Sequence, residues 1–164
     1  MLISLSRKRN RTQFLNHFKY LTKKITIGRT DRAHFPELGF LDIDIKIDTG
    51  AYTSSIYCTD IGEEDGALTA NFLDPEHPKY NGRKMYFEEY EITQVRSSNG
   101  QSQLRYEVKT IITLFKKHYV ISLTLSDRKE MRYPVLIGRK FLSKKFVVDT
   151  ELQDLSFILS QNEN

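Results

Sequence analysis

The residues best suited to catalysis are Asp48, Thr49, Gly50 and Ala51. They directly follow Leu41–Ile47, a run in which apolar and charged residues alternate. A carboxylate at the end of an apolar strand, beside a tight glycine turn, is held rigidly and can serve as a general acid or base. Gly50 allows the backbone to turn sharply and to approach a substrate closely. The sequence Asp-Thr-Gly also occurs in ordinary Asx-type turns at the ends of strands. A catalytic role for Asp48 therefore needs support from elsewhere in the chain.

A second motif, Ile137-Gly138-Arg139, follows an apolar run and opens a short helical pattern. A glycine at this point lets one strand pass close beneath an active-site loop. We therefore expect Ile137, Gly138 and Arg139 to support the Asp48 turn. Arg139 is expected to be largely buried, and a buried arginine needs an acidic partner. The candidates for that partner are Asp149 first and Asp127 second.

A third motif is the polar stretch Ser97-Ser98-Asn99-Gly100, which separates two strand-like runs. Asn-Gly is among the strongest sequence signals for a hairpin turn. We predict that residues 95–104 form a hairpin that projects over Asp48. Because the tip has no apolar residue to anchor it, this hairpin is expected to move as a flap that closes over a substrate.

The order of these motifs resembles that of the retropepsin-like aspartic proteases, which carry a DTGA turn, then a flap, then an apolar-Ile-Gly-Arg segment. Further motifs make the chain similar to the RimK/LysX family, a bacterial group often called ATP-dependent zinc proteases. They lie within roughly Ile25–Thr150 and comprise Ile27–Arg29, Pro36–Gly39, Lys46–Ala51, Thr53–Ser55, Arg96–Gly100, Leu125–Arg128, Tyr133–Arg139 and Val147–Asp149.

This resemblance implies an aspartic endopeptidase, in which two carboxylates share one proton around a single water. The chain holds one DTG turn, so the dyad requires a C2 homodimer that brings two copies of Asp48 together. Leu152–Leu159 is predicted to supply a terminal strand for that interface. Two features depart from the viral retropepsins: Tyr52 replaces the acid that pairs with the arginine of the Gly-Arg segment there, and residues 60–84 look like an insertion.

The family also implies partners: a peptide or protein substrate, and an ATP-grasp ligase such as a RimK-type glutamate ligase. The alternative function is a non-catalytic module that binds a peptide or such a ligase in the same cleft. A third possibility is a scaffold tethered by its basic N-terminal segment to a membrane or to nucleic acid.

No metal or other cofactor is predicted. The four histidines, at positions 17, 34, 77 and 118, are scattered, and the chain has neither a His-Glu-x-x-His helix nor a phosphate-binding P-loop. A zinc site built from His34, His77 and Cys58 is an alternative, although it lacks the usual ligand spacing. Because Cys58 is the single cysteine, an intrachain disulfide is excluded, and we expect a reducing, cytoplasmic location.

The elements that must position these residues are strands, because the dominant hydrophobic period after Lys24 is two. The predicted strands are Leu41–Ile47, Tyr86–Val95, Tyr106–Phe115, His118–Leu125, Pro134–Ile137 and Phe146–Val148. A tight connection is predicted at Phe115–His118. Short strands separated by frequent turn signals predict an all-β domain over residues 25–164, which we expect to be a retropepsin-like closed barrel.

Residues 1–24 form a separate basic extension, predicted to contain a short helix. They hold seven of the 25 basic side chains and no acid, so the net charge of +4 belongs to this segment. The rest of the chain is slightly acidic, and no nucleic-acid binding is expected from the barrel. No run approaches 18 apolar residues, so a membrane partner is not expected. A targeting peptide, a helix that binds weakly to a membrane surface or to nucleic acid, and a helix docked on the domain stay open.

Overall fold

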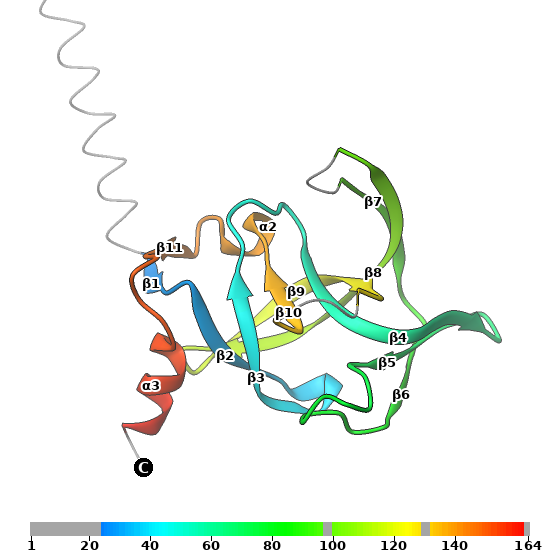
Figure 1. Cartoon of the computed structure of the whole chain (residues 1–164), viewed down its shortest axis with the longest axis horizontal. Coiled ribbons are helices and arrows are strands. Elements are labelled where there is room, and N and C mark those ends of the chain that lie inside the picture. The colour runs from blue at the N-terminus through cyan, green and yellow to red at the C-terminus, as the bar shows by residue number, and fades with distance from the viewer. Residues whose placement is uncertain (1–23, 97–99, 129–131, 163–164) are drawn as a thin grey trace, which may run out of the picture.

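The computed structural model describes residues 24–96, 100–128 and 132–162, and most of this chain is β-strand (Figure 1). The strands are β1 (Ile25–Ile27), β2 (Thr30–Phe35), β3 (Phe40–Ile47), β4 (Ser54–Glu64), β5 (Ala67–Phe72), β6 (Lys84–Phe87), β7 (Glu91–Arg96), β8 (Ser102–Leu114), β9 (Lys117–Ser126), β10 (Val135–Ile137) and β11 (Phe146–Val148). The helical segments are η1 (Pro36–Leu38), α2 (Arg139–Leu142) and α3 (Leu155–Gln161). The predicted all-β class is confirmed.

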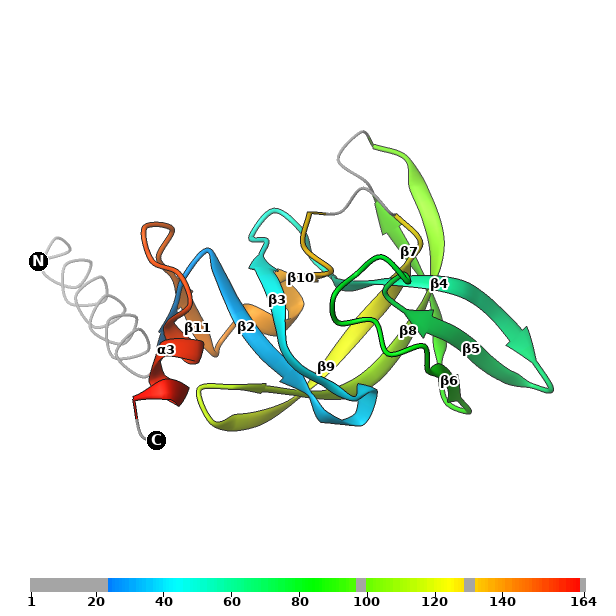
Figure 2. The same cartoon turned by 60° about the horizontal axis from the view of Figure 1, so that its bottom comes forward.

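The larger sheet follows the order β10-β3-β2-β8-β9-β4-β5-β6, with β7 paired to β8. Because β10 also pairs with β4, the path through β10, β3, β2, β8, β9 and β4 returns to its start (Figure 2). This ring is uneven: β2 meets β8 at the single pair His34–Thr113, whereas β8 and β9 pair all along residues 107–114. The finer prediction of a closed barrel is therefore not confirmed.

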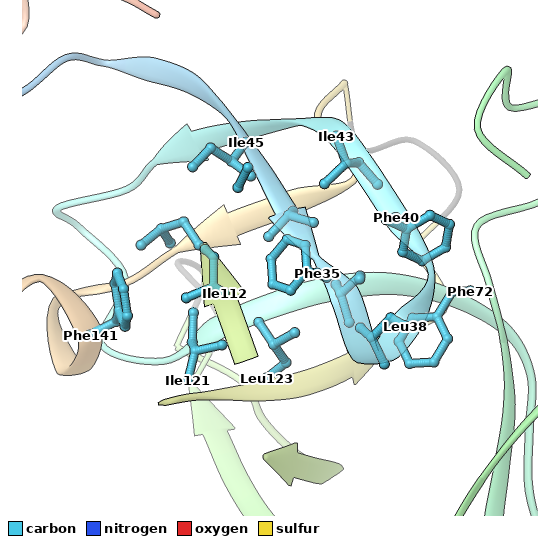
Figure 3. Close-up of a cluster of buried hydrophobic side chains, with 14 of the residues drawn as sticks. Phe35, Leu38, Phe40, Ile43, Ile45, Phe72, Ile112, Ile121, Leu123 and Phe141 are labelled. Atoms are coloured by element: carbon cyan, nitrogen blue, oxygen red, sulfur yellow. The ribbon is translucent and has the colours of Figure 1, made fainter. Parts of the chain in front are cut away.

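The strand that leads to the candidate site shows the alternation expected from its sequence. In β3, Ile43, Ile45 and Ile47 are buried, whereas Asp44 and Lys46 between them are exposed. The isoleucines join a core that is drawn in Figure 3 and that also contains Phe35, Leu38, Phe40, Phe72, Ile112, Ile121, Leu123 and Phe141. Burial of this face fixes the register of β3, and with it the position of the residue that follows Ile47.

The connection between β8 and β9 is a two-residue turn of Phe115 and Lys116, with Leu114 paired to Lys117. Both turn residues have positive φ, 50° and 58°. That conformation belongs to the type I′ turn, whose twist matches that of the two strands. The predicted tight connection is confirmed.

Residues 60–84, which look like an insertion in the sequence, hold regular structure: Leu68, Ala70 and Phe72 are buried in the core and form β5, which pairs with the outer part of β4. One predicted strand needs correction. The run Tyr86–Val95 is two strands, β6 and β7, which pair with different neighbours.

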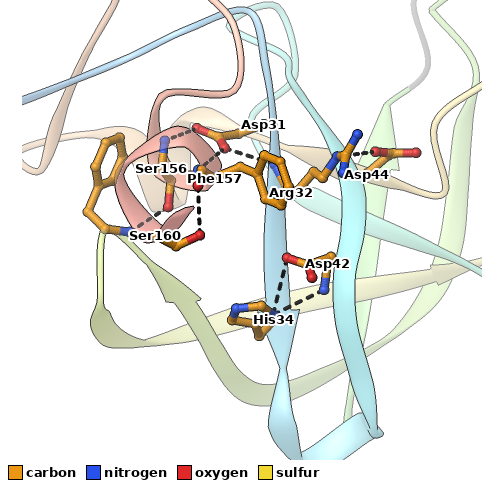
Figure 4. A network of polar contacts seen from close by, with 9 residues as sticks. Asp31, Arg32, His34, Asp42, Asp44, Ser156, Phe157 and Ser160 are labelled. Carbon is orange, nitrogen blue, oxygen red and sulfur yellow. Dashed lines mark hydrogen bonds and ion pairs between the residues drawn. The ribbon is translucent and has the colours of Figure 1, made fainter. Parts of the chain in front are cut away.

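The C-terminal segment Leu152–Leu159 is also different from the prediction: it contains the start of helix α3 and no strand. The buried Asp31 carboxylate accepts hydrogen bonds from the backbone N–H groups of Ser156 (2.9 Å) and Phe157 (3.1 Å), as Figure 4 shows. It thereby satisfies N–H groups that have no partner within a helix. The hydroxyl of Ser156 in turn accepts from Phe115 N at 2.6 Å. These contacts anchor α3 on β2 and on the β8–β9 turn, and they leave the predicted dimer strand unformed.

The predicted basic helix within residues 1–24 lies outside the described residues, except for Lys24. The predicted domain boundary between residues 24 and 25 is therefore not tested. In the described part of the chain, no helix has the length and apolar character that a membrane span needs.

Candidate active site

Asp48 lies directly after β3 at the start of a tight loop, and its side chain is partly exposed. Its backbone N–H donates to the carbonyl oxygen of Ile137 at 2.9 Å, which fixes the loop to β10. Carboxylate oxygen Oδ1 accepts from Gly50 N at 3.0 Å and from Ala51 N at 3.2 Å. Oδ2 has no hydrogen-bond partner among the described residues. One edge of the carboxylate is therefore held by the loop, and the other oxygen is left for a ligand.

Gly138 permits the close approach that the sequence predicts. A methyl group placed on Gly138 would lie 2.4 Å from the carbonyl oxygen of Thr53, closer than real side-chain atoms come. Its N–H donates to the hydroxyl of buried Ser54 at 3.0 Å. Further along, Arg139 N donates to Ala51 O at 3.0 Å. The Asp48 loop and the segment after β10 are thus bound to each other at several successive residues.

Arg139 differs from the prediction, because it is exposed and is not paired with an acid. Its Nη1 donates to two carbonyl oxygens, those of Thr49 and Gly50, each at 2.8 Å. Among the described residues no carboxylate lies within ion-pair distance of it, so the proposed pairs with Asp149 and Asp127 are wrong. The physical reason is that the carbonyl oxygens of Thr49 and Gly50 act as hydrogen-bond acceptors for the guanidinium. Because Arg139 is exposed, its charge needs no acidic partner.

Asp48 opens onto a cleft of about 440 Å³. The floor comes from β4, β9 and β10, and the arms of the β7–β8 hairpin form one wall. The lining residues are Asp48, Gly50, Ala51, Thr53, Ser55, Val95, Arg96, Arg105, Thr124, Ser126, Arg128 and Leu136. Thr49 and Ile137 support the loop from outside this lining.

The predicted flap coincides with the β7–β8 hairpin. Its arms pair from Glu91–Glu107 to Arg96–Ser102, and Figure 1 shows the β7 end rising on the same side of the molecule as the β3–β4 connection. Val95 and Arg96 line the Asp48 cleft. Gly100 has φ +82°, as a turn glycine would. Ser97, Ser98 and Asn99 lie outside the described residues.

Three arginines give the cleft a positive character that the sequence analysis missed. Arg96, Arg105 and Arg128 come from β7, from β8 and from the segment after β9, and Asp48 is the single acid among the described residues of the lining. Burial lowers the pKa of Arg105 from its usual value, the charge of Arg128 lowers it further, and Asp127 opposes this. The guanidinium of Arg105 donates to Gln103 Oε1 at 3.0 and 3.2 Å, a neutral acceptor. The cleft is therefore suited to an anionic ligand.

The residues of the alternative zinc site have separate contacts. His34 Nδ1 accepts from Asp42 N, His77 Nδ1 accepts from Lys79 N, and the Cys58 thiol is fully buried next to Ile56 O. Burial raises the pKa of that thiol, which disfavours the thiolate that metals bind. This structure gives no support to a zinc site at these three residues.

Comparison with known families now adds to the geometry. The RimB-like family, described as "Retropepsin-like aspartic endopeptidase RimB", matches residues 26–156. The chain belongs to the RimB-like family. The matched range includes the Asp48 loop, the β7–β8 hairpin, β10 and Gly138, so the resemblance to retropepsins seen in the sequence is confirmed at the level of the family.

Relatives of this RimB-like chain include two named "Probable alpha-L-glutamate ligase". One, from Shewanella pealeana, is 35% identical over 132 residues, which cover 77% of this chain and 28% of the relative. The other, from Shewanella halifaxensis, is 33% identical over 147 residues, 86% of this chain and 31% of the relative. This chain thus spans less than a third of either relative.

The RimB-like fold is also similar to a solved structure from Legionella pneumophila, described as a protein with unknown function. The TM-score is 0.59 at 27% sequence identity, and the match covers 80% of this chain and 97% of that chain.

Proposed function

We propose that this domain is an aspartic endopeptidase of the retropepsin type, with its uneven ring of strands serving as the retropepsin barrel. The observation that carries the proposal is Asp48: one carboxylate oxygen is fixed by Gly50 N and Ala51 N, and the side chain lines a cleft large enough for a peptide. The support from β10 and Gly138 keeps the carboxylate in place without a contribution from substrate.

The reaction requires two such carboxylates. The chain supplies one DTG turn, so we propose a C2 homodimer in which two Asp48 side chains meet at the axis. Two carboxyl groups in direct contact at the axis cannot both be ionised, because their negative charges repel each other. They therefore share one proton. The ionised carboxylate accepts a proton from a water molecule, which attacks the scissile carbonyl carbon, and the protonated carboxylate gives its proton to the carbonyl oxygen. In the collapse of the tetrahedral intermediate, the carboxyl group that took the proton of the water gives a proton to the amide nitrogen, the C–N bond breaks, and a hydroxyl of the intermediate returns its proton to the other carboxylate.

The charges of the cleft favour an acidic substrate. Arg96, Arg105 and Arg128 line the same cleft as Asp48, which is the single acid among the described lining residues, and guanidinium groups bind carboxylates through strong, directional hydrogen bonds. Relatives of this chain are named glutamate ligases. We propose that the substrate is a peptide rich in glutamate, such as the product of a ligase of that kind, and that an ATP-grasp ligase is the functional partner.

A non-catalytic module is the second candidate, and one observation favours it. In relatives named for ligation, the region similar to this chain is less than a third of the protein. In that setting a cleft lined with arginines would hold an acidic peptide for a ligase without cutting it.

Hydrolysis of a fluorogenic oligoglutamate peptide by the purified chain tests the proposal. Asp48→Asn should abolish hydrolysis, while the new amide oxygen can still accept from Gly50 N and Ala51 N, so the fold and peptide binding should persist. Asp44→Asn is the matched control: Asp44 lies on β3, the strand that leads to Asp48, pairs with Arg32 outside the cleft lining, and its replacement should keep full activity. If the unmodified chain binds the peptide but never cleaves it, the binding module is the better description.

A further inference from the structure

A second pocket of about 420 Å³ lies on the other side of β10 from the Asp48 cleft. It is formed by the start of β2, the end of β3 and the segment that leads into β10. Its lining residues are Arg29, Thr30, Lys46, Ile47, Arg132, Tyr133 and Leu136. Leu136 lines both pockets, and Asp48 is the next residue after Ile47, so the two pockets adjoin at the candidate catalytic loop.

Strand register places residues of the two pockets in one row on the same face of the sheet. Thr30 pairs with Lys46, Lys46 with Leu136, Leu136 with Ser55, and Ser55 with Thr124. Residues that pair directly across neighbouring strands project from the same face of a sheet. Thr30, Lys46 and Leu136 line the second pocket, and Leu136, Ser55 and Thr124 line the first. This row crosses five strands.

The length of the row fits an extended peptide. Neighbouring strands lie about 4.8 Å apart, so the row spans roughly 19 Å. An extended chain advances about 3.3 Å per residue, so roughly six residues of a peptide would cover both pockets. A small anion would occupy one pocket only.

The second pocket is also positive. Among the described residues, Arg29, Lys46 and Arg132 line it without an acidic residue, and none of the three has an ion pair with another described residue. Arg29 donates to two neutral acceptors, Thr150 O at 3.2 Å and Gln153 Oε1 at 3.1 Å, so its charge is not neutralised. Lys46 is exposed, and Arg132 lies 5.7 Å from the ring centre of Tyr133.

We propose that this second pocket binds a further carboxylate of the same acidic peptide, through Lys46 and Arg132. The peptide then lies along the row with acidic side chains on both sides of Leu136, one set near Arg96, Arg105 and Arg128 and the other near Lys46. This inference rests on the proposed acidic substrate and adds a second set of specificity residues. Arg29 is the less suitable variant for a test, because it also holds the C-terminal segment.

The experiment uses the full chain carrying Asp48→Asn, so that binding is measured without cleavage. Fluorescence anisotropy gives the affinity for oligoglutamates of three and eight residues, with an eight-residue oligoglutamine as the uncharged control. The eight-residue oligoglutamate should bind more tightly than the three-residue one. Adding Lys46→Gln and Arg132→Gln together should weaken its binding about tenfold, as expected for loss of charged contacts at exposed sites, and should remove the advantage of length.

Lys109→Gln is the matched control, because Lys109 is also an exposed cation, lies outside the lining of both pockets and pairs with Glu91. It should leave both affinities unchanged, and thermal unfolding should show that every variant is folded. Equal affinity of long and short peptides overturns the inference, and so does a double variant that keeps the advantage of length. Cleavage by the chain with intact Asp48 is measured separately. Absence of cleavage would reject the peptidase proposal, whereas the binding results alone decide the role of the second pocket.

Discussion

The guanidinium of Arg139 donates to the carbonyl oxygen of Thr49, the residue next to Asp48, at 2.8 Å. The same Nη1 atom donates to Gly50 O, so one cation holds two successive peptide groups of the candidate catalytic loop. Arg139 is exposed, and the contact therefore orients the loop more than it stabilises the fold. A positioning residue of this kind has separable effects on activity and on stability.

Arg139→Gln should therefore reduce turnover about tenfold or more while lowering the free energy of unfolding by only about 1 kcal/mol, the size of a hydrogen bond at an exposed site. Peptidase kinetics and urea denaturation measure the two effects. Arg139→Lys should restore part of the turnover, because an ammonium group can reach one carbonyl oxygen. A large loss of stability with unchanged turnover would contradict the positioning role.

Gly138→Ala should be strongly destabilising, by about 3 kcal/mol or more, because its methyl group would lie 2.4 Å from the backbone oxygen of Thr53. Backbone atoms cannot move away as a flexible side chain can. Gly62→Ala is the matched control: the added methyl group has no neighbour within 4 Å, and the change should be neutral or slightly stabilising. Chemical denaturation of both variants tests the difference, and equal stabilities would refute the close approach.

The sequence predicts the backbone geometry at the centre of the candidate site. The approach of Gly138 to the Asp48 loop follows from two motifs taken together, an Asp-Thr-Gly turn and a glycine after an apolar strand, because a glycine permits close contact between backbones. The partner of Arg139 could not be predicted in this way, because its acceptors are carbonyl oxygens and every residue has one. A search for an acidic side chain therefore led to Asp149 and Asp127.

Other features depend on contacts between distant segments. Arg96, Arg105 and Arg128 meet in one cleft because β7, β8 and β9 pair in a particular register, which no local pattern specifies. The short apolar run near Leu155 is compatible with strand or helix. Asp31, which lies on β2 far away in the sequence, accepts from the first N–H groups of the helix and so favours it.

If the dyad is formed by two copies of the chain, the activity of a mixture depends on the square of the fraction of chains that carry Asp48. When equal amounts of the unmodified chain and Asp48→Asn are mixed and allowed to exchange subunits, about a quarter of the dimers carry two Asp48 side chains. Activity should fall to about a quarter of that of the unmodified chain at the same total concentration. Independent monomers would instead retain half of the activity. The measurement is peptidase activity across a series of mixing ratios. Asp44→Asn, which is expected to keep full activity, is the control and should produce no loss on mixing.

The pH dependence of stability should reveal the buried carboxyl group of Asp31. Burial raises its pKa above the usual 3.8, the nearby charge of Asp154 adds to this, and the N–H groups of Ser156, Arg32 and Phe157 oppose it. Between the usual and the raised pKa, the folded chain holds a proton that the unfolded chain has lost. The free energy of unfolding must therefore increase on acidification through this window, by at most about 1.4 kcal/mol per pH unit.

Asp31→Asn removes this titration, since an amide does not ionise in the window. The difference in free energy of unfolding between the unmodified chain and Asp31→Asn should shift in favour of the unmodified chain as the pH falls from neutral towards 3.8. Urea denaturation at a series of pH values measures that difference and cancels the titration of other groups. Asp44→Asn removes an exposed carboxylate on the neighbouring strand and is the control for the loss of one acidic side chain. A difference that moves in the opposite direction would mean that the N–H groups at the start of α3 outweigh burial and hold the Asp31 carboxylate in its charged form.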